Sequence, residues 1–203
     1  MSTRLVLATR NAGKLAELQR LLTDAVPGVV VVGLRDVPEY PEAPETGATF
    51  AENALLKARE AVRYTGLPAV ADDSGITVDA LNGMPGILSA RWSGRHGDDP
   101  ANTALLLAQI ADVPDERRGA GFVCAAALVT PDGREEVVQR EWRGRVIREE
   151  RGTNGFGYDP VFVPEGLEIT SAELAAAEKD ARSHRAQAFA ALVPVVAEAL
   201  GGR

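Results

Sequence analysis

The sequence predicts an α/β fold: a single domain built on a mixed, strongly twisted β-sheet with flanking helices. Two observations carry this prediction. Strand-like apolar runs and segments of helical periodicity are mixed along the chain, and a long β-hairpin pattern occupies its second half. The length of 203 residues suits one domain, residues 1–203, and leaves room for two lobes.

The chain begins with a strand, a polar turn and a helix. Residues 5–8 form a short apolar run, and residues 29–32 form a second one. Between them a helix from about Ala12 carries one apolar face, made of Leu15, Leu18 and Leu22. A capping box at Thr49 and Glu52 opens a second helix, which Gly66 and Pro68 end. The inward face of that helix is expected to consist of Ala51, Leu55, Ala58 and Val62.

The middle of the chain predicts a strand, a helix and a hairpin. Residues 69–71 form a short strand that runs into Asp72-Asp73-Ser74-Gly75. A helix is expected to start with Asp99 as N-cap and Pro100 in its first turn, and to continue through Ile110. Two strand-like segments, 122–129 and 136–147, are joined by the turn 131–133 and should pair as a hairpin.

The last part of the chain predicts a tight loop, a strand and a closing helix. The loop covers residues 154–160 and the strand residues 161–163. The helix is expected from about Ser183 to Leu200, with a kink at Pro194. Its inward face would be Phe189, Leu192, Val196 and Leu200.

Composition and charge exclude several classes of function. The net charge is −7 and no block of Lys and Arg suggests a nucleic-acid surface. The longest apolar run, residues 122–129, is far shorter than the ~20 residues that span a bilayer. The single cysteine, Cys124, has no partner for an internal disulfide and suits the core of a cytoplasmic protein.

A strand-to-helix turn at residues 8–14, Ala-Thr-Arg-Asn-Ala-Gly-Lys, could bind phosphate. Free backbone N–H groups and the positive end of the helix dipole attract anions at such a turn. The turn is not a Walker A loop, because Leu15 follows Lys14 where that loop needs Ser or Thr. An ordinary turn capped by Asn11 explains the same residues equally well.

Ser183-His184-Arg185 places basic groups at the expected start of the last helix. Cations in a first turn oppose the helix dipole, and a bound anion would reverse that cost. The alternative is that Arg185 pairs with a neighbouring carboxylate while His184 is neutral.

Carboxylates that could hold a hard cation occur at Glu42 and Glu45 and at Asp72-Asp73. Mg²⁺ takes one or two carboxylates and completes its shell with water and phosphate oxygens. Zinc is not expected, because the chain has two His and one Cys. The alternative is an Asx-type turn at Asp73 and solvated glutamates, which we favour for Glu42.

The loop 154–159 places Phe156 and Tyr158 between glycines, where a planar ring could stack. A packed turn is the alternative. The lysines add support, since only three of the 22 basic residues are lysine: Lys14, Lys57 and Lys179. A compact ammonium aimed at phosphate oxygens is one reason to keep Lys in a chain that otherwise uses Arg.

Six blocks follow one another between residues 8 and 185. They are Ala8-Thr-x-Asn-x-Gly-Lys14, Glu45-Thr-Gly-x-Thr-Phe-x-Glu-Asn-Ala-x-x-Lys-Ala58, Ala71-Asp-Asp-Ser-Gly75, Gly83-x-Pro-Gly-x-x-Ser-Ala-Arg91, Gly155-Phe-Gly-Tyr-Asp-Pro160, and Ala172-Glu-Leu-x-x-x-Glu-Lys179 with Ser183-His-Arg185. Each block is weak alone. Together they resemble the Ham1-like family of non-canonical purine nucleoside triphosphate pyrophosphatases, which are inosine triphosphatase-like, or dITP/XTP, pyrophosphatases.

The resemblance implies a Mg²⁺-dependent hydrolase that converts ITP, dITP and XTP to the monophosphate and pyrophosphate. Such an enzyme keeps damaged purines out of nucleic acids. The resemblance also implies a two-lobed fold with an active-site cleft between the lobes, and a homodimer.

The resemblance also assigns roles to individual residues. It implies that the triphosphate lies along Thr9, Arg10, Asn11, Ala12, Gly13 and Lys14. It makes Asp73 the metal ligand and proton acceptor and Glu45 the second carboxylate, although Pro44 stands where relatives can have another acid. Ser74 would lie beside the substrate, and the base would be surrounded by Phe156, Gly157, Tyr158, Asp159, Lys179, His184 and Arg185. The catalytic residues are then Asp73 and Lys14, with Lys57 also offsetting charge on the triphosphate.

Two other functions fit the same residues. A different hydrolase could use Asp72 or Asp73 as a nucleophile that forms an aspartyl-phosphate and releases orthophosphate. A non-catalytic module would bind nucleoside triphosphates without turnover. Identification of the products separates all three.

Overall fold

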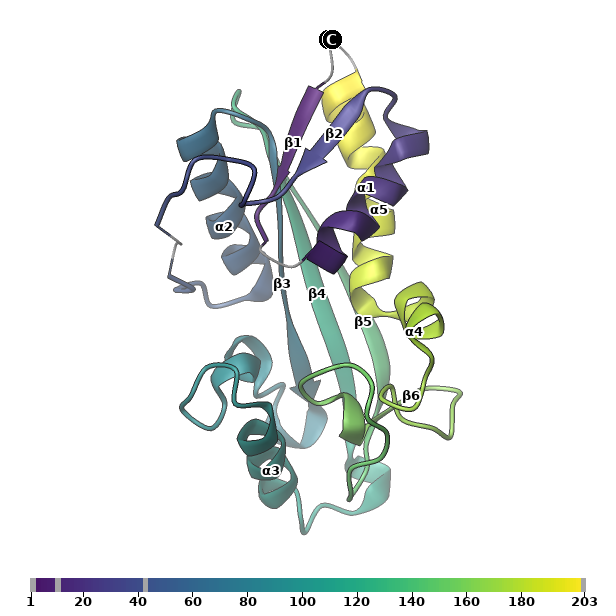
Figure 1. Ribbon diagram of the computed structural model, residues 1–203. Helices are drawn as coiled ribbons and strands as arrows, with labels where there is room; N and C mark the ends of the chain where they lie inside the picture. Colours follow the sequence, from purple (N-terminus) through teal and green to yellow (C-terminus); the bar gives the residue numbers. More distant parts are fainter. Residues whose placement is uncertain (1–2, 10–11, 42–43, 202–203) are drawn as a thin grey trace. The chain divides into compact units, whose positions relative to one another are not determined.

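The computed structural model describes residues 3–9, 12–41 and 44–201 (Figure 1). Six strands of this part of the chain form one sheet in the order β2-β1-β3-β4-β5-β6. They are β1 (Thr3–Leu7), β2 (Val29–Val32), β3 (Ala69–Val78), β4 (Gly119–Val129), β5 (Glu135–Val146) and β6 (Phe162–Pro164). β1 is parallel to β2 and β3, whereas β5 is antiparallel to β6. The predicted α/β class with a mixed sheet is confirmed.

The helices are α1 (Ala12–Ala25), α2 (Phe50–Thr65), α3 (Asp99–Gln109), α4 (Ala176–Arg182) and α5 (His184–Gly201). In the described part of the chain, none of them has the length and apolar composition that a membrane crossing requires. The predicted hairpin is present as β4 and β5, which are neighbours in the sheet and are joined by a short turn. The short helix α4 was not expected from the sequence.

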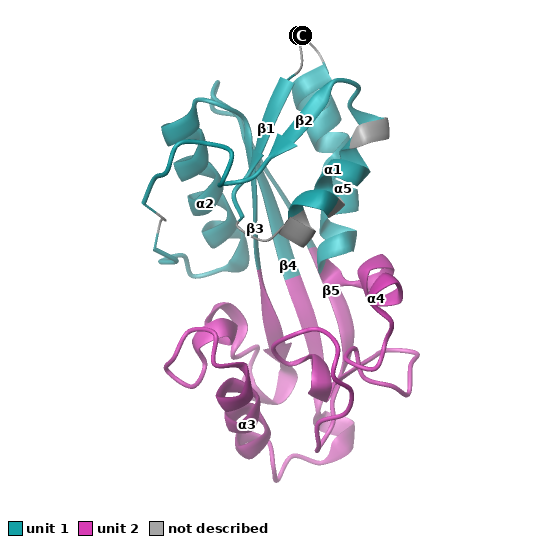
Figure 2. Ribbon diagram, in the orientation of Figure 1, with its two compact units in different colours: residues 1–73, 124–139, 185–203 teal, residues 74–123, 140–184 magenta. Residues whose placement is uncertain are grey.

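The chain divides into two compact units (Figure 2). Unit 1 comprises residues 1–73, 124–139 and 185–203. Unit 2 comprises residues 74–123 and 140–184. Because the divisions fall inside β3, β4 and β5, these three strands contribute residues to both units.

In unit 1 the alternation of side chains along the strands produces two apolar layers. Leu5 and Leu7 of β1 pack in one cluster with leucines of α1 and with Phe189 of α5. Val6, which points to the opposite face, packs in another cluster with Ala61 of α2. Figure 1 accordingly shows α2 on one side of the strands and α1 with α5 on the other.

Unit 2 has its own core, which includes Tyr158 and Phe162. Arg118 is buried there and donates to three backbone carbonyls: Val146 O at 2.8 Å, Ile110 O at 2.6 Å and Ile147 O at 3.1 Å. Burial lowers the pKa of this guanidinium, and the neighbouring charge of Arg148 acts in the same direction. The three bonds satisfy carbonyls at the ends of α3 and β5 and thereby fix the segments that carry them.

The buried face of α2 differs from the predicted one. Ala58 is buried as expected, but Ala51, Leu55 and Val62 are only half-buried. The buried residues are Phe50, Asn53, Ala54, Ala58 and Ala61. Apolar spacing alone misplaced this face, because the helix buries mainly small side chains and one amide. The caps are as predicted: Thr49 accepts from the Glu52 N–H, and Gly66 ends the helix with a φ of 67°.

The acidic pair Asp72-Asp73 lies inside β3 and not at its end. The predicted strand 69–71 is in fact ten residues long, from Ala69 to Val78, so the Asx-turn interpretation is wrong. Two consecutive acids are tolerated in mid-strand because each is paired with a cation, Arg185 for Asp72 and Lys57 for Asp73.

The N-cap of α3 is Asp98, one residue earlier than predicted. Its carboxylate accepts from the Ala101 N–H at 3.3 Å. Asp99 instead accepts from the Gly157 N–H at 2.7 Å, so its side chain serves a distant loop of unit 2. Either aspartate could cap the helix, and it is the contact of Asp99 with the distant loop that leaves Asp98 as the N-cap.

Candidate active site

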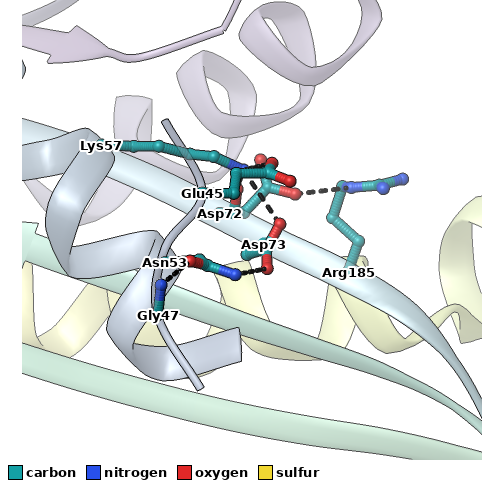
Figure 3. A network of polar contacts seen from close by, with 7 residues as sticks. All are labelled: Glu45, Gly47, Asn53, Lys57, Asp72, Asp73 and Arg185. Atoms are coloured by element: carbon teal, nitrogen blue, oxygen red, sulfur yellow. Dashed lines mark hydrogen bonds and ion pairs between the residues drawn. The ribbon is translucent and has the colours of Figure 1, made fainter. Parts of the chain in front are cut away.

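In unit 1 the ammonium of Lys57 lies between two carboxylates (Figure 3). Its Nζ is 2.7 Å from Glu45 Oε1 and 2.9 Å from Asp73 Oδ1. The two acids come from separate segments, the loop before α2 and the strand β3. We call the group formed by Glu45, Asn53, Lys57, Asp72, Asp73 and Arg185 the carboxylate cluster.

Local structure places each member of this cluster. Asn53 and Lys57 are four residues apart on α2, so they lie on one face of the helix. Asp72 and Asp73 are consecutive in β3, so their side chains leave opposite faces of the strand. Asp73 therefore meets α2, whereas Asp72 meets α5 through Arg185.

The electrostatics of Asp73 are set by burial against a close cation. Burial raises the pKa of the Asp73 carboxyl, and the nearby Glu45 charge adds to this, while Lys57 and the Asn53 amide oppose it. For Lys57 burial favours the neutral amine, but Asp73 and Glu45 outweigh it and hold the pKa above its ordinary value. Lys57 therefore remains an ammonium, beside a carboxylate that is easier to protonate than an exposed aspartate.

The second acid of β3 forms its own ion pair. Asp72 Oδ2 accepts from Arg185 Nε at 3.3 Å, and the Asp72 side chain is only 2% exposed. This pair corresponds to the alternative interpretation of Arg185, in which it neutralises a neighbouring carboxylate. A guanidinium carries five N–H donors, and the bond to Asp72 uses the one on Nε.

The expected phosphate turn follows β1 directly. Thr9 comes after the strand and its N–H donates to Leu7 O at 2.7 Å, while α1 begins at Ala12. Gly13 and Lys14 are thus in the first turn of a 14-residue helix, as a phosphate-binding turn requires. Arg10, Asn11 and Glu42 lie outside the described residues, as do the side chains of residues 12–14.

In unit 2, Asp159 is the centre of a second polar group. Its Oδ1 accepts from Ser171 Oγ at 2.7 Å, and its Oδ2 accepts from the Phe156 N–H at 2.8 Å and from Lys179 Nζ. Asp159 is buried, and both oxygens of its carboxylate accept hydrogen bonds from these neighbours. We call Phe156, Asp159, Ser171 and Lys179 the loop cluster.

The loop cluster holds an exposed aromatic ring. Phe156 is 62% exposed, and Lys179 Nζ lies 5.1 Å from the centroid of its ring. Gly155 has a φ of +80°, and a Cβ at this position would collide with the Asp159 carboxylate. The backbone on either side of Phe156 is therefore fixed, although the ring itself faces solvent.

The other predicted residues of unit 2 are more enclosed. Tyr158 belongs to the core and its hydroxyl donates to Ser89 O at 2.8 Å; burial, helped by the charge of Asp99, raises its pKa, so it remains a neutral donor. The His184 ring stacks on Phe122 with centroids 5.1 Å apart. Ser74 follows Asp73 in β3 and is half-buried.

Sequence reasoning gave no role to several of these partners. Asn53 lies in one of the sequence blocks, and an amide among the alanines of a buried helix face was the available signal. Ser171 and Phe122 carry no local signal, because each becomes a partner only through tertiary contact with Asp159 and with His184.

Comparison with known proteins gives matches along nearly the whole chain. The sequence model of the Ham1 family matches residues 5–195. A relative from Nocardia farcinica, named dITP/XTP pyrophosphatase, is 65% identical over 195 residues, which are 96% of this chain and 95% of that protein.

Solved structures are similar as well. The crystal structure of a nucleoside-triphosphatase / dITP/XTP pyrophosphatase from Mycobacterium abscessus is 64% identical, with a TM-score of 0.82, covering 95% of this chain and 100% of that chain. A HAM1 protein structure from Coxiella burnetii is 42% identical, with a TM-score of 0.88, covering 97% of this chain and 99% of that chain.

Proposed function

We propose, since this chain belongs to the Ham1 family, that it hydrolyses the non-canonical purine nucleoside triphosphates ITP, dITP and XTP to the nucleoside monophosphate and pyrophosphate. The observation that carries the proposal is the meeting of Glu45 and Asp73 at one ammonium group. The activity named for the relatives supports it. Hydrolysis of these triphosphates would keep damaged purines out of nucleic acids.

The donor set of the carboxylate cluster fits Mg²⁺. Glu45 and Asp73 offer hard oxygens, and the Lys57 ammonium shows that a cation is stable in contact with both. Among residues 3–9, 12–41 and 44–201, no three His, Cys, Asp or Glu side chains gather as a metal site. Mg²⁺ commonly takes only one or two carboxylates, so we propose that Asp73 and Glu45 hold it.

The chemistry that Mg²⁺ would supply is neutralisation of the charge that develops on phosphate oxygens. Asp73 would orient the attacking water and accept its proton as the oxygen bonds to phosphorus and pyrophosphate leaves with the electrons of the broken P–O bond. In the metal-free protein, burial raises the pKa of the Asp73 carboxyl above that of an exposed aspartate. Lys57 would keep the two acids facing each other and offset charge on the triphosphate.

We also propose that the first turn of α1 binds the triphosphate. The strand-to-helix geometry at Thr9 and Ala12 supports this role, because unpaired N–H groups at a helix start attract phosphate. Lys14 would add a point charge, with Arg10, Asn11 and Gly13 completing the turn.

For the purine base, we propose the residues of unit 2 together with Arg185. The exposed ring of Phe156, on a fixed loop, suits stacking on a planar base. Inosine and xanthosine carry an oxo group at C6, where adenosine carries an amino group. N–H groups of His184 and Arg185 would donate to the oxo group, whereas they would face another donor in adenosine. Gly157, Tyr158, Asp159 and Lys179 would shape this part of the site, and Ser74 would lie beside the substrate.

We further propose that residues 1–203 act as one domain, in the cytoplasm and as a homodimer, with a small nucleotide as the partner and neither nucleic acid nor membrane. The net charge of −7 supports the lack of polyanion binding. Cys124, which is buried, fits a reducing compartment.

The test is product identification. Purified protein is incubated with ITP, dITP, XTP, ATP or GTP in the presence of Mg²⁺, and the products are separated by ion-exchange chromatography. We expect monophosphate and pyrophosphate from the first three. Orthophosphate would indicate the aspartyl-phosphate chemistry, and binding without turnover would indicate a nucleotide-binding module.

A further inference from the structure

Asn53 connects Asp73 of the carboxylate cluster to the loop that carries Glu45, although it is not itself charged. It is completely buried, and both ends of its amide are engaged (Figure 3). Its Nδ2 donates to Asp73 Oδ2 at 3.1 Å, and its Oδ1 accepts from the Gly47 N–H at 2.8 Å. Gly47 is two residues after Glu45, so one side chain contacts Asp73 and the loop that carries Glu45.

The bonds at Asp73 divide its two oxygens between two partners. Oδ2 is bonded to Asn53, whereas Oδ1 is the oxygen that meets Lys57. The same Lys57 ammonium also meets Glu45. The Asn53 amide therefore holds the carboxylate in the orientation in which Oδ1 faces the same cation as Glu45 does.

The loop before α2 is packed closely against the start of that helix. A Cβ at Gly47 would lie 2.7 Å from Asn53 Oδ1 and 2.7 Å from Glu52 Cβ, closer than real Cβ atoms come. The next N–H of the loop, from Ala48, donates to Glu52 Oε2 at 2.6 Å. Glycine at this position thus allows the backbone to reach the amide of Asn53.

We propose that Asn53 is a positioning residue, which locks Asp73 and, through Gly47, the Glu45 loop in the arrangement that lets both carboxylates bind one divalent cation. This inference rests on the proposed function for the identity of the cation and the reaction. Partners that orient metal ligands commonly change metal affinity or activity by about 10- to 100-fold when removed.

The chain offers a matched control in Asn102. It is four residues after the N-cap Asp98 of α3, as Asn53 is four residues after the N-cap Thr49 of α2. It is also buried, accepts from the Ser93 N–H at 2.7 Å and donates to Ala90 O at 3.3 Å. It anchors a loop in the same way but contacts no carboxylate through these bonds, so Asn102→Ala reports the structural cost of losing a buried asparagine.

The experiment compares Asn53→Ala with Asn102→Ala in three measurements: the Mg²⁺ concentration for half-maximal pyrophosphate release from ITP, the hydrogen–deuterium exchange of the peptide containing Gly47 in metal-free buffer, and the thermal midpoint. We expect Asn53→Ala to raise the Mg²⁺ requirement about tenfold and to speed exchange at Gly47. Asn102→Ala should lower the thermal midpoint similarly and change neither of the other two.

A Mg²⁺ requirement and Gly47 exchange that stay at wild-type values in Asn53→Ala would overturn the proposal, as would an equal rise in Mg²⁺ requirement in Asn102→Ala. If Asn53→Ala does not fold, Gly47→Ala replaces it, because its methyl group would displace the loop from Asn53. A wild-type Mg²⁺ requirement in Gly47→Ala would contradict the proposal.

If the wild-type protein releases no pyrophosphate, the proposed function fails. The Gly47 exchange in metal-free protein then decides the positioning role alone: faster exchange in Asn53→Ala supports it, and unchanged exchange overturns it.

Discussion

The two units each contain a lysine bonded to a buried aspartate, and the surroundings of the two pairs differ. In unit 1, Lys57 meets Asp73 and Glu45, and the residues drawn in Figure 3 include three acids against two cations. In unit 2, Lys179 meets Asp159, and Ser171 and the Phe156 N–H engage the same carboxylate. In the first group two carboxylates contact one ammonium, an arrangement that also suits a metal ion, whereas in the second one carboxylate accepts from an ammonium, a hydroxyl and a backbone N–H.

This comparison separates reacting groups from supporting ones. A buried carboxylate that shares its cationic partner with a second acid can exchange that partner for a metal ion, as at Asp73, where burial and the nearby Glu45 charge raise the pKa. A carboxylate whose oxygens are all engaged fixes the backbone around it, as Asp159 fixes the loop that carries Phe156. The predictions below test this distinction.

The largest expected effect is that of Asp73→Asn, which keeps the shape of the side chain and removes its charge. We expect kcat/KM for ITP to fall by about 10³-fold, because the variant loses both a proton acceptor and a metal ligand. The thermal midpoint in metal-free buffer should change little, because the amide avoids burial of a charge, which offsets the cost of an NH₂ group that must face a donor, Lys57 Nζ or Asn53 Nδ2. Steady-state kinetics and thermal unfolding on the same preparation test this, and near-normal activity would remove Asp73 from the mechanism.

The corresponding change in unit 2, Asp159→Asn, should lower stability strongly and activity only weakly. Removing one partner of a buried pair leaves Lys179 without its counter-charge, so we expect a loss of about 2 kcal/mol in the free energy of unfolding. The effect on kcat should stay within about tenfold, because Asp159 acts through Phe156 and Lys179. Urea unfolding and kinetics measure the two effects. A thousandfold loss of kcat with unchanged stability would make Asp159 a reacting group.

Lys57→Met tests whether Glu45 and Asp73 depend on a shared cation. Without the ammonium, Glu45 and Asp73 face each other unshielded, and we expect a loss of about 1–2 kcal/mol in metal-free buffer, since the pair is partly exposed. Added Mg²⁺ should raise the thermal midpoint of the variant by more than it raises the thermal midpoint of the wild type, because in the variant the metal would take the place of the missing ammonium. Equal responses to Mg²⁺ in the two proteins would show that the carboxylates do not share a cation.

The smallest expected effect is a pH dependence of stability. Because the pKa of Asp73 is raised in the folded protein, its carboxylate lowers stability at pH values above that pKa, and acidification removes this cost. In metal-free buffer the free energy of unfolding of the wild type, measured relative to that of Asp73→Asn, should therefore rise as the pH falls from about 7 toward about 4. Urea unfolding of both proteins at several pH values measures this difference, and a fall of the wild type relative to the variant on acidification would contradict the direction of the pKa shift.

Much of this fold follows from sequence periodicity and caps. β2 has the predicted bounds, α2 begins after the Thr49 cap, and the hairpin of β4 and β5 forms. The six sequence blocks also pointed to the family that the comparisons show. The errors occur where tertiary contact decides, as in the N-cap of α3 and in the length of β3, which continues through two acids because distant cations neutralise them.

The candidate site was predicted residue by residue but not in its internal contacts. Lys57, Asp73 and Glu45 were expected in one site, and the structure brings them together. The link through Asn53 was missed because the inward face of α2 was assigned from its apolar residues alone, and an amide among alanines was not counted as part of that face. The expected cleft between the lobes stays a prediction, as do the roles of Arg10, Asn11 and Lys14.

The central claim is that Glu45 and Asp73 jointly bind the metal while Asp159 supports a loop. The most direct test is the Mg²⁺ concentration for half-maximal pyrophosphate release from ITP, measured for wild type, Glu45→Gln and Asp159→Asn. We predict a rise of about tenfold or more in Glu45→Gln and no change in Asp159→Asn. An unchanged Mg²⁺ requirement in Glu45→Gln, or an equal rise in both variants, would contradict the claim.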